Sequence, residues 1–491
     1  MNGAAYIMVI LGIFLAKGLG FLRDIIFASA FGATAYTDIY FQIFGLVNLV
    51  FTGVGVALST LVIKNMNKSE NSSDGANREY VSYFIVKTSS FIILATAIMY
   101  AFAKPIVRIL LPGLDEGLMG VAMKLMYIML PSFLFVVVAY IISGVLQNNR
   151  VFFISSVMSL PFNVVIIASL FFKNVDIVTV GIVTTIGWFL HIAIQLPSFY
   201  KKGYHLVKDY TKKIAYKGNN KEVLYIFISN MMFQVCFMID KAFVSSQSGA
   251  ATTINYASNL FITISSVFVV AMSNVVFPSI SKNYEEGNLD YVKELLKYIL
   301  TVLLAIFVPF ILTVCCFGKN IIALLYERGE FTPQLTAATA MLFAVYTIGA
   351  LGYVCQELLN KVLYLDSRYK TTVIGTIAVI LIKPVINYFA VDYGVLAVSI
   401  TTAALFIIYG VNILISLAKV AGNYMDREFC KSTIKILLSA IAALLGYFIL
   451  KLTFPIILNG KYSFLIGLLI CAVIYAGMLL ASGVAKKLYK R

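Results

Sequence analysis

Charged residues inside long apolar stretches are the part of this sequence best suited to chemistry. Such residues include Lys17, Arg23, Asp24, Asp38, Asp240, Lys241 and Lys383. An ionised group in an apolar segment is costly to bury, so each is expected to face a cavity or a partner of opposite charge. Only two histidines are present, which argues against a histidine-based catalytic or metal centre.

Three of these charges lie close together in the first apolar stretch. Lys17 and Asp24 are seven residues apart, which places them on one face of an α-helix. Arg23 lies about 100° from Asp24 around the helix axis, which is near enough to line the same cavity. Arginine binds phosphate oxygens through two parallel hydrogen bonds. The pattern therefore favours contact with a phosphate-bearing substrate, although a structural Arg23–Asp24 pair remains the alternative.

A second set of charges lies far along the chain. Asp240 and Lys383 are predicted to pair because each otherwise lacks an obvious partner in an apolar stretch. Lys241 and Asn387 join them as candidates for a coupling or structural role. A monovalent cation bound at Asp240 is the competing interpretation, and no other metal site is predicted.

The elements that must position these residues are membrane-spanning helices. The chain is 61% hydrophobic and 12% charged, with a mean hydropathy of +0.92, whereas soluble domains carry roughly 25% charged residues. A spanning helix needs about twenty apolar residues. Runs of that length predict fourteen helices, at about 4–30, 36–63, 81–103, 118–146, 151–172, 176–199, 223–247, 251–281, 291–318, 334–363, 370–390, 393–418, 433–454 and 463–484.

The positive charges predict how these helices are oriented. Lysine and arginine number 25 in the loops and tail on the side of the N-terminus, against 7 on the opposite side. Cytoplasmic loops are the basic ones, so both termini are predicted to be cytoplasmic. The net charge of +16 therefore indicates how the chain is oriented in the membrane and does not indicate nucleic-acid binding.

The sequence also contains an internal repeat. The segment 23-RDIIFASAFGATAYTDIY-40 corresponds to 239-IDKAFVSSQSGAATTINY-256, and 161-PFN-163 corresponds to 384-PVIN-387. The repeat predicts two parallel six-helix lobes with a substrate site between them. The predicted division is an N-lobe at 1–200, a basic cytoplasmic linker at 201–222, a C-lobe at 223–420, and two further helices with a basic tail at 421–491.

Several motifs resemble one known family. The segments are 18-GLGFLRDIIFASAFGATAYTDIYF-41, 143-SGVLQNNRVFF-153, 255-NYASNL-260, 277-FPSISK-282, 325-LYERGEFT-332 and 364-YLDSRYKT-371. In this order they resemble the MurJ (MviN) family of the MOP flippase and exporter superfamily, over about residues 1–420. The last two helices match that family by topology only.

The resemblance implies a V-shaped, all-α transporter whose central cavity binds the substrate. Arg23, Asp24 and Asp38 occupy motif positions that line this cavity. The full predicted substrate-binding set is Lys17, Arg23, Asp24, Asp38, Asn48, Asn255 and Asn259. Lys17 and Asn259 stand where the family usually has arginine, and the stretch beginning at Asn48 lacks the arginine pair commonly found there.

The function implied by the resemblance is transport and not catalysis. The chain is expected to flip undecaprenyl-pyrophosphate-linked peptidoglycan precursor, lipid II, across the bacterial cytoplasmic membrane by alternating access. No cofactor is expected, and the membrane potential or a monovalent cation gradient would drive the movement. The expected partners are the lipid-linked glycan, membrane lipids and cell-wall synthesis proteins, with no nucleic acid.

Three other functions remain open on the sequence alone. A flippase for another polyprenyl-linked oligosaccharide, of capsule, teichoic acid or exopolysaccharide, would explain the missing arginines. A MATE-like cation-coupled exporter would need a cavity richer in carboxylates. A membrane glycosyltransferase would need catalytic acids on an outer loop, where Asp115 and Glu116 are the only adjacent pair.

Overall fold

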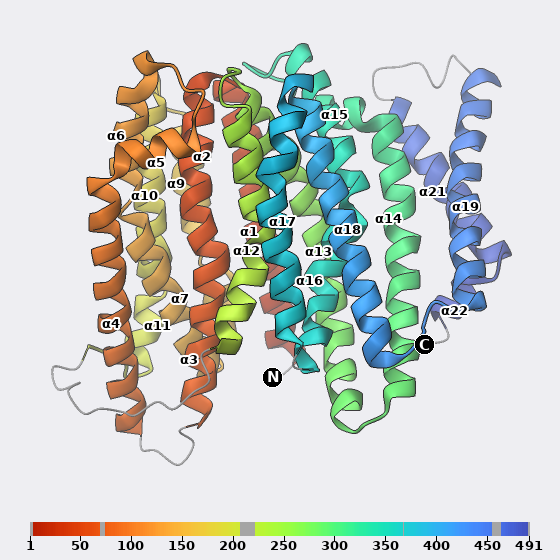
Figure 1. The fold of residues 1–491 in the computed structure, drawn as a ribbon, viewed down its shortest axis with the longest axis horizontal. Helices are drawn as coiled ribbons and strands as arrows, with labels where there is room; N and C mark the ends of the chain where they lie inside the picture. Colours follow the sequence, from red (N-terminus) through yellow and green to blue (C-terminus); the bar gives the residue numbers. More distant parts are fainter. Residues whose placement is uncertain (1–2, 69–73, 207–220, 367, 454–462, 490–491) are drawn as a thin grey trace. The chain divides into compact units, whose positions relative to one another are not determined.

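The computed structural model of this chain is built from helices. It describes residues 3–68, 74–206, 221–366, 368–453 and 463–489, and these contain no strand. Residues 207–220, most of the predicted basic linker, lie outside the described residues (Figure 1). The predicted all-α class is confirmed.

Within each described range the helices follow one another with short connections. The first twelve are α1 Gly3–Phe31, α2 Ala35–Leu49, α3 Val56–Lys68, α4 Asp74–Ala101, α5 Ala103–Leu110, α6 Met119–Met129, α7 Ser132–Asn148, α8 Phe152–Ser156, α9 Leu160–Ser169, α10 Ile177–Ala193, α11 Leu196–Lys201 and α12 Lys221–Phe243. The others are α13 Ala250–Glu285, α14 Leu289–Tyr326, α15 Pro333–Ile348, α16 Ala350–Leu365, α17 Tyr369–Ala390, α18 Val395–Ala421, α19 Arg427–Thr453, α21 Ser463–Ala481 and α22 Val484–Tyr489.

Every predicted apolar run falls on a helix or on a broken helix. A π-helical segment, Val50–Gly55, separates α2 from α3. The run at 118–146 is interrupted near Pro131, and the run at 334–363 is bent by 47° between α15 and α16. Proline and π-helical turns are common causes of such bends. Hydropathy thus located the helices but not their breaks.

Many of these helices are long and apolar enough to cross a membrane. Among the described residues, ten segments meet this test, or eleven if the bent pair α15–α16 counts as one span. The helices α1, α12 and α13 are 29, 23 and 36 residues long, and a span needs roughly 20 residues. The count of fourteen spans stays a prediction.

The chain divides into two compact units. The first comprises Met1–Tyr256, Arg328–Thr332 and Thr376–Val395, and the second comprises Ala257–Glu327, Pro333–Gly375 and Leu396–Arg491. The first unit therefore joins the N-terminal helices to α12, the start of α13 and the second part of α17. The lobe boundaries suggested by the sequence repeat stay a prediction.

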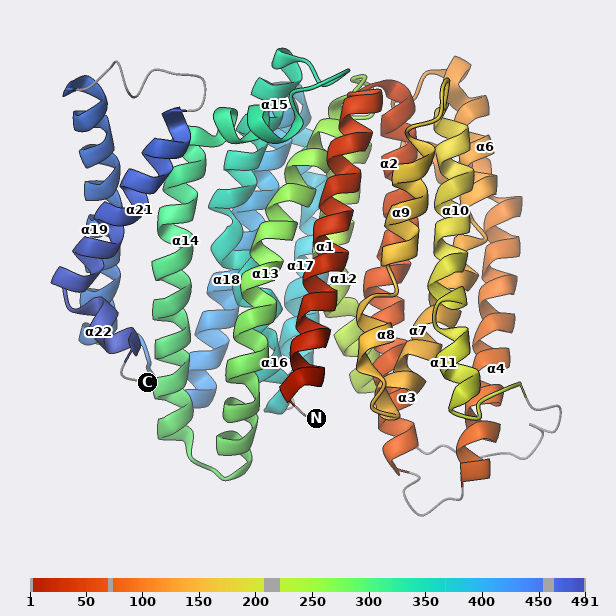
Figure 2. The ribbon, with the colours of Figure 1, turned by 180° about the vertical axis from the view of Figure 1, so that it is seen from behind.

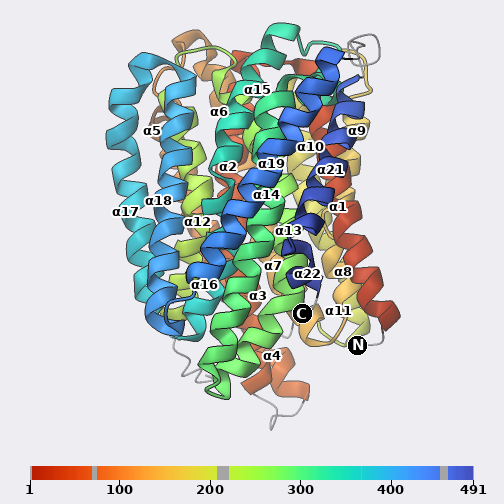
Figure 3. The same cartoon turned by 90° about the vertical axis from the view of Figure 1, so that its right-hand side faces the viewer.

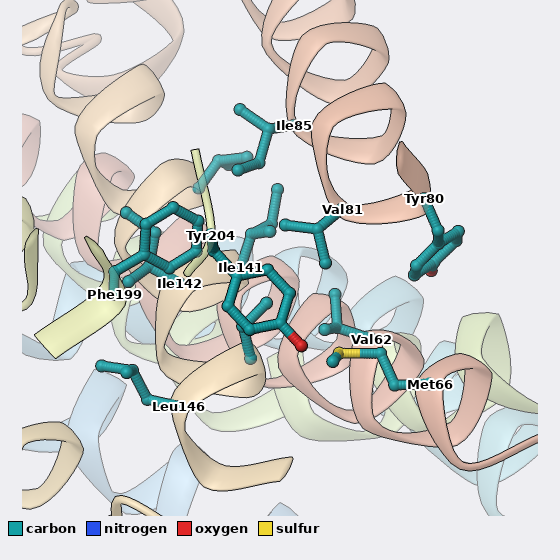
Figure 4. Close-up of a cluster of buried hydrophobic side chains, with 12 residues drawn as sticks. Val62, Met66, Tyr80, Val81, Ile85, Ile141, Ile142, Leu146, Phe199 and Tyr204 are labelled. Carbon is teal, nitrogen blue, oxygen red and sulfur yellow. The ribbon is translucent and has the colours of Figure 1, made fainter. Parts of the chain in front are cut away.

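A buried apolar cluster holds α3, α4 and α7 of the first unit together. Val62 and Met66 of α3 pack with Val81 of α4 and with Ile141 and Ile142 of α7 (Figure 4). In a membrane such packing gains little from expelling water, so close van der Waals contact provides most of the stability. The cluster fixes α3 against α4 and α7.

In the second unit, α19 and α21 pack beside α14 (Figure 3). Lys297 of α14 donates to Asp426 at 2.7 Å and to Glu428 at 3.0 Å, where α19 begins. The hydrogen bond from Lys297 holds the pKa of Asp426 below its ordinary value. Further along the same helices, the Phe317 ring lies 5.0 Å from that of Tyr447. These contacts attach α19 and α21 to α14 at two levels.

Candidate functional site

The charged cluster of α1 is held against α9 in the first unit. Helix α1 runs beside α8 and α9 (Figure 2). Arg23 donates from Nε to Asp24 Oδ1 at 3.0 Å and from Nη2 to the same oxygen at 2.7 Å. It also donates from Nη1 to Asn163 Oδ1 of α9 at 3.2 Å. We call Arg23, Asp24 and Asn163 the first charge frame.

Aromatic rings enclose the guanidinium of this frame. The centre of the Arg23 guanidinium lies 5.8 Å from the Phe44 ring and 5.5 Å from the Phe162 ring. A cation is attracted to the negative face of such a ring. The side chains of Arg23 and Asp24 nevertheless remain 16% and 10% exposed. The frame is therefore held in place and still partly exposed.

A second group of similar chemical types joins α12 to α17, two helices labelled in Figure 1. Lys383 Nζ lies 2.5 Å from Asp240 Oδ1 and donates to Asn387 Oδ1 at 2.8 Å. Asn387 Nδ2 donates in turn to Asp240 Oδ1 at 2.8 Å. We call Lys383, Asp240 and Asn387 the second charge frame. The predicted pairing of Asp240 with Lys383 is thus present in the structure.

The second charge frame is sealed from its surroundings. The side chains of Asp240 and Lys383 are both 0% exposed, and Asn387 is also fully buried. Ionised groups at such depth persist only when charge and hydrogen bonds are satisfied locally. The ammonium of Lys383 supplies the positive charge that the Asp240 carboxylate requires.

The two charge frames occupy corresponding places in the repeat. Asp24 and Asp240 align, and each frame takes its asparagine from a helix containing a repeat proline. The cation differs in origin, because it comes from α1 in the first frame and from α17 in the second. The carboxylate and the amide thus come from corresponding helices in the two frames, whereas the cation comes from a different helix in each.

Asp38 joins the start of α2 to the turn between α12 and α13. Its carboxylate accepts hydrogen bonds from the backbone N–H of Gly249 and of Thr252, both at 2.6 Å, and from Thr252 Oγ1 at 2.6 Å. Asp38 is only 3% exposed. The N-terminus of a helix favours a negative charge, so Asp38 stabilises the start of α13 while tying α2 to it.

The turn that meets Asp38 requires glycine. Gly249 has φ +81°, and a Cβ there would lie 2.7 Å from the Ala33 carbonyl oxygen. Glycine alone reaches this backbone conformation without steric cost. Gly32, at the corresponding turn after α1, has φ +58°. The repeated Gly-Ala of the sequence therefore marks two similar turns.

The remaining predicted residues are dispersed around these groups. Lys241 is 2% exposed and donates to Asn255 Oδ1 at 2.7 Å, within the α12–α13 hairpin. Asn48 donates to Gln234 Oε1 of α12 at 3.5 Å. Lys17 and Asn259 are half-buried. Substrate contact by this set stays a prediction.

Sequence reasoning missed Asn163. The residue was visible as part of the repeated 161-PFN-163 motif, and its counterpart Asn387 in 384-PVIN-387 was predicted, but Asn163 itself was not. Among the described residues, no cluster of three or more His, Cys, Asp or Glu side chains is placed to hold a metal ion.

Comparison with known proteins gives consistent matches. The family model described as Lipid II flippase MurJ matches residues 27–471. The "Probable lipid II flippase MurJ" of Buchnera aphidicola subsp. Acyrthosiphon pisum is 26% identical over 392 residues, 77% of this chain and 76% of that protein. The "Lipid II flippase MurJ" of Burkholderia cenocepacia is 24% identical over 389 residues, 76% of this chain and 75% of its own length.

Solved structures share the fold. "Lipid II flippase MurJ, inward closed conformation" matches with a TM-score of 0.80 at 23% identity, covering 99% of this chain and 100% of that one. An inward-facing multidrug resistance MATE family transporter of the MOP superfamily matches with a TM-score of 0.63 at 13% identity, covering 82% and 94%. At sequence identities this low, the matches show only that the fold is shared.

Proposed function

This chain belongs to the lipid II flippase MurJ family, and from that premise we propose that it moves lipid II from the inner to the outer leaflet. The family is one of transporters and not of enzymes, and its many apolar helices make the chain a multi-pass protein of the bacterial inner membrane. We propose that both termini are cytoplasmic, on the basis of the lysine and arginine distribution.

The observation that carries this proposal is the partly exposed first charge frame. Lipid II presents a pyrophosphate, which needs fixed positive charge within the membrane. Arg23 offers a planar guanidinium that is 16% exposed and oriented by Asp24 and Asn163. Lys17, on the face shared with Asp24, adds a further positive charge. With two cations and one carboxylate, α1 retains a net positive charge for the headgroup.

Alternating access supplies the mechanism. The sequence repeat assigns α2 to one lobe and the α12–α13 turn to the other, and Asp38 bridges them through three hydrogen bonds. We propose that these bonds hold one gate closed and break when the lobes rock apart. In this mechanism the headgroup crosses between the lobes while the polyprenyl tail stays in lipid.

The membrane potential is the proposed driving force. An inside-negative potential favours outward movement of an anion by about 2.3 kcal/mol per charge per 100 mV. Asp240 is the predicted candidate for a monovalent cation, but Lys383 already neutralises its carboxylate at 2.5 Å. We therefore propose that no exchangeable cation at Asp240 drives transport. The proposed partners are lipid II, membrane lipids and cell-wall synthesis proteins.

Complementation tests this function. In a bacterium depleted of its own MurJ, the wild-type chain should restore growth, and Arg23→Ala at equal membrane abundance should not. Lys104→Ala, a change to an exposed residue in α5, is the matched control and should rescue fully. Failure of well-expressed wild type, together with transport of another polyprenyl-linked glycan, would contradict the lipid II assignment.

A further inference from the structure

The side chain of Asn163 fastens α1 to α9 at the first charge frame. Its Oδ1 accepts from Arg23 Nη1 at 3.2 Å, and its Nδ2 donates to the Ser159 carbonyl at 3.1 Å and to the Ala16 carbonyl at 3.5 Å. Asn163 is 4% exposed. A buried amide with both ends engaged has a defined orientation, so the position of its oxygen is fixed relative to α1.

Asn163 and Asp24 hold different edges of the same guanidinium. Asp24 accepts from Nε and Nη2, whereas Asn163 accepts from Nη1. The Phe44 and Phe162 rings lie about the guanidinium at 5.8 and 5.5 Å. These contacts together define the plane of the group. A cation oriented before binding loses less conformational freedom when an anion arrives.

We propose that Asn163 is a positioning residue that orients Arg23 toward the phosphates of the substrate. The inference rests on the proposed function, in which Arg23 meets the lipid-linked pyrophosphate. An amide suits this role because it accepts a hydrogen bond without cancelling the positive charge. A carboxylate at position 163 would instead add a second negative charge beside Asp24 and neutralise the frame.

The second charge frame provides an internal control. Asn387 contacts its cation through Oδ1, as Asn163 does, and it also donates to the carboxylate of Asp240. That frame is 0% exposed, so its asparagine can support only structure. The same amide therefore serves substrate positioning where the frame is open and stability where it is sealed.

A double-mutant cycle in lipid II binding tests the role of Asn163. Trp188 is the sole tryptophan, and its ring lies 4.7 Å from that of Phe162, so its fluorescence should report on ligand at this frame. Asn163→Ala should raise the dissociation constant for lipid II about tenfold in the wild-type background. In an Arg23→Ala background the same change should alter it less than about twofold, because the residue acts through Arg23.

Stability measurements separate positioning from packing. Asn163→Ala removes a buried, hydrogen-bonded amide and should lower the melting temperature by a few degrees, but by less than Asn387→Ala, which also takes a partner from the sealed Lys383–Asp240 pair. If Asn163→Ala folds poorly, the isosteric Asn163→Asp gives the second test and should weaken binding more than tenfold. Equal weakening in both Arg23 backgrounds, or wild-type affinity in Asn163→Asp, would overturn the inference.

Failure of the inference differs from failure of the proposed function. Weak binding by Arg23→Ala with normal binding by Asn163→Ala would remove the positioning role and leave Arg23 in place. Normal binding by Arg23→Ala would overturn both the site and the role of Asn163. Absence of lipid II binding by the wild-type chain would contradict the proposed function itself.

Discussion

The two charge frames contain the same chemical groups and differ in exposure. Arg23 and Asp24 retain 16% and 10% of their side-chain surface, whereas Lys383 and Asp240 retain none. A sealed ion pair has no access to a ligand and supports the fold, while an open one can exchange a partner. The comparison teaches that a charge within a membrane helix is not by itself a sign of a binding site.

The origin of the cation separates the frames as well. In the first frame the cation precedes its carboxylate on the same helix, at Arg23 and Asp24. In the second it crosses from α17 to α12, which ties two helices together. The residue that aligns with Arg23 is Ile239. With the two asparagines aligned, Ser159 lies four residues before Asn163, where Lys383 lies four before Asn387. Substitutions at these aligned positions can therefore move the cation of a frame from one helix to the other.

The largest expected effect comes from removing the cation of the sealed frame. Lys383→Met leaves the buried carboxylate of Asp240 without its counter-charge, and breaking such a pair costs about 3–5 kcal/mol. We expect a markedly lower melting temperature in detergent, with Ile382→Ala, an exposed neighbour on α17, as the control. A melting temperature equal to that of wild type would show that the pair contributes nothing to the fold.

A relocated cation should recover part of that loss. Lys383→Ser combined with Ile239→Arg gives the second frame the arrangement of the first, with the cation beside Asp240 on α12. Restoring the counter-charge should return roughly half of the lost stability, as thermal unfolding of the single and double variants would measure. A double variant no more stable than Lys383→Ser would refute the equivalence of the two frames.

A milder change at the open frame should affect transport without affecting stability. Arg23→Lys keeps the charge but loses the planar fork that binds two phosphate oxygens. We expect the half-saturating lipid II concentration to rise about tenfold, equivalent to roughly 1.4 kcal/mol. The melting temperature should stay within about 2 °C. A lower melting temperature without a change in affinity for lipid II would show that Arg23 supports the fold, as Lys383 and Asp240 do.

The smallest expected effect concerns the identity of the cation in the medium. Because Lys383 neutralises Asp240 internally, replacing sodium by potassium or choline at constant potential should change lipid II transport by less than about twofold, or 0.4 kcal/mol. Initial rates in proteoliposomes would measure this. A steep sodium dependence that Asp240→Asn abolishes would contradict the account of the sealed frame.

The sequence predicted much of the fold because membrane helices obey strong rules. Each apolar run coincides with a helix, since backbone groups in lipid must bond internally. The breaks were missed, because the π-helical turn at Val50–Gly55 and the 47° bend before α16 both lie within continuous apolar runs. Apolar length alone carries no such information.

Charge was the strongest signal for the site. Asp240 and Lys383 were matched because two buried charges need each other, and the structure contains their pair. Asn163 was missed although its counterpart Asn387 was predicted, because its partner Arg23 lies 140 positions away and already has the adjacent Asp24 as an obvious partner. Asp38 was predicted to line the cavity. Its hydrogen bonds to Gly249 and Thr252 were not predicted, because they form only when the fold brings the start of α13 close to α2.

The most direct test of this account is lipid II movement in proteoliposomes that contain the purified chain under a membrane potential. The wild-type protein should transfer lipid II between leaflets, and Arg23→Ala at equal folded amount should reduce the initial rate at least tenfold. Equal rates for the two proteins, or no transfer by the wild type, would contradict the claim that lipid II crosses by way of the first charge frame.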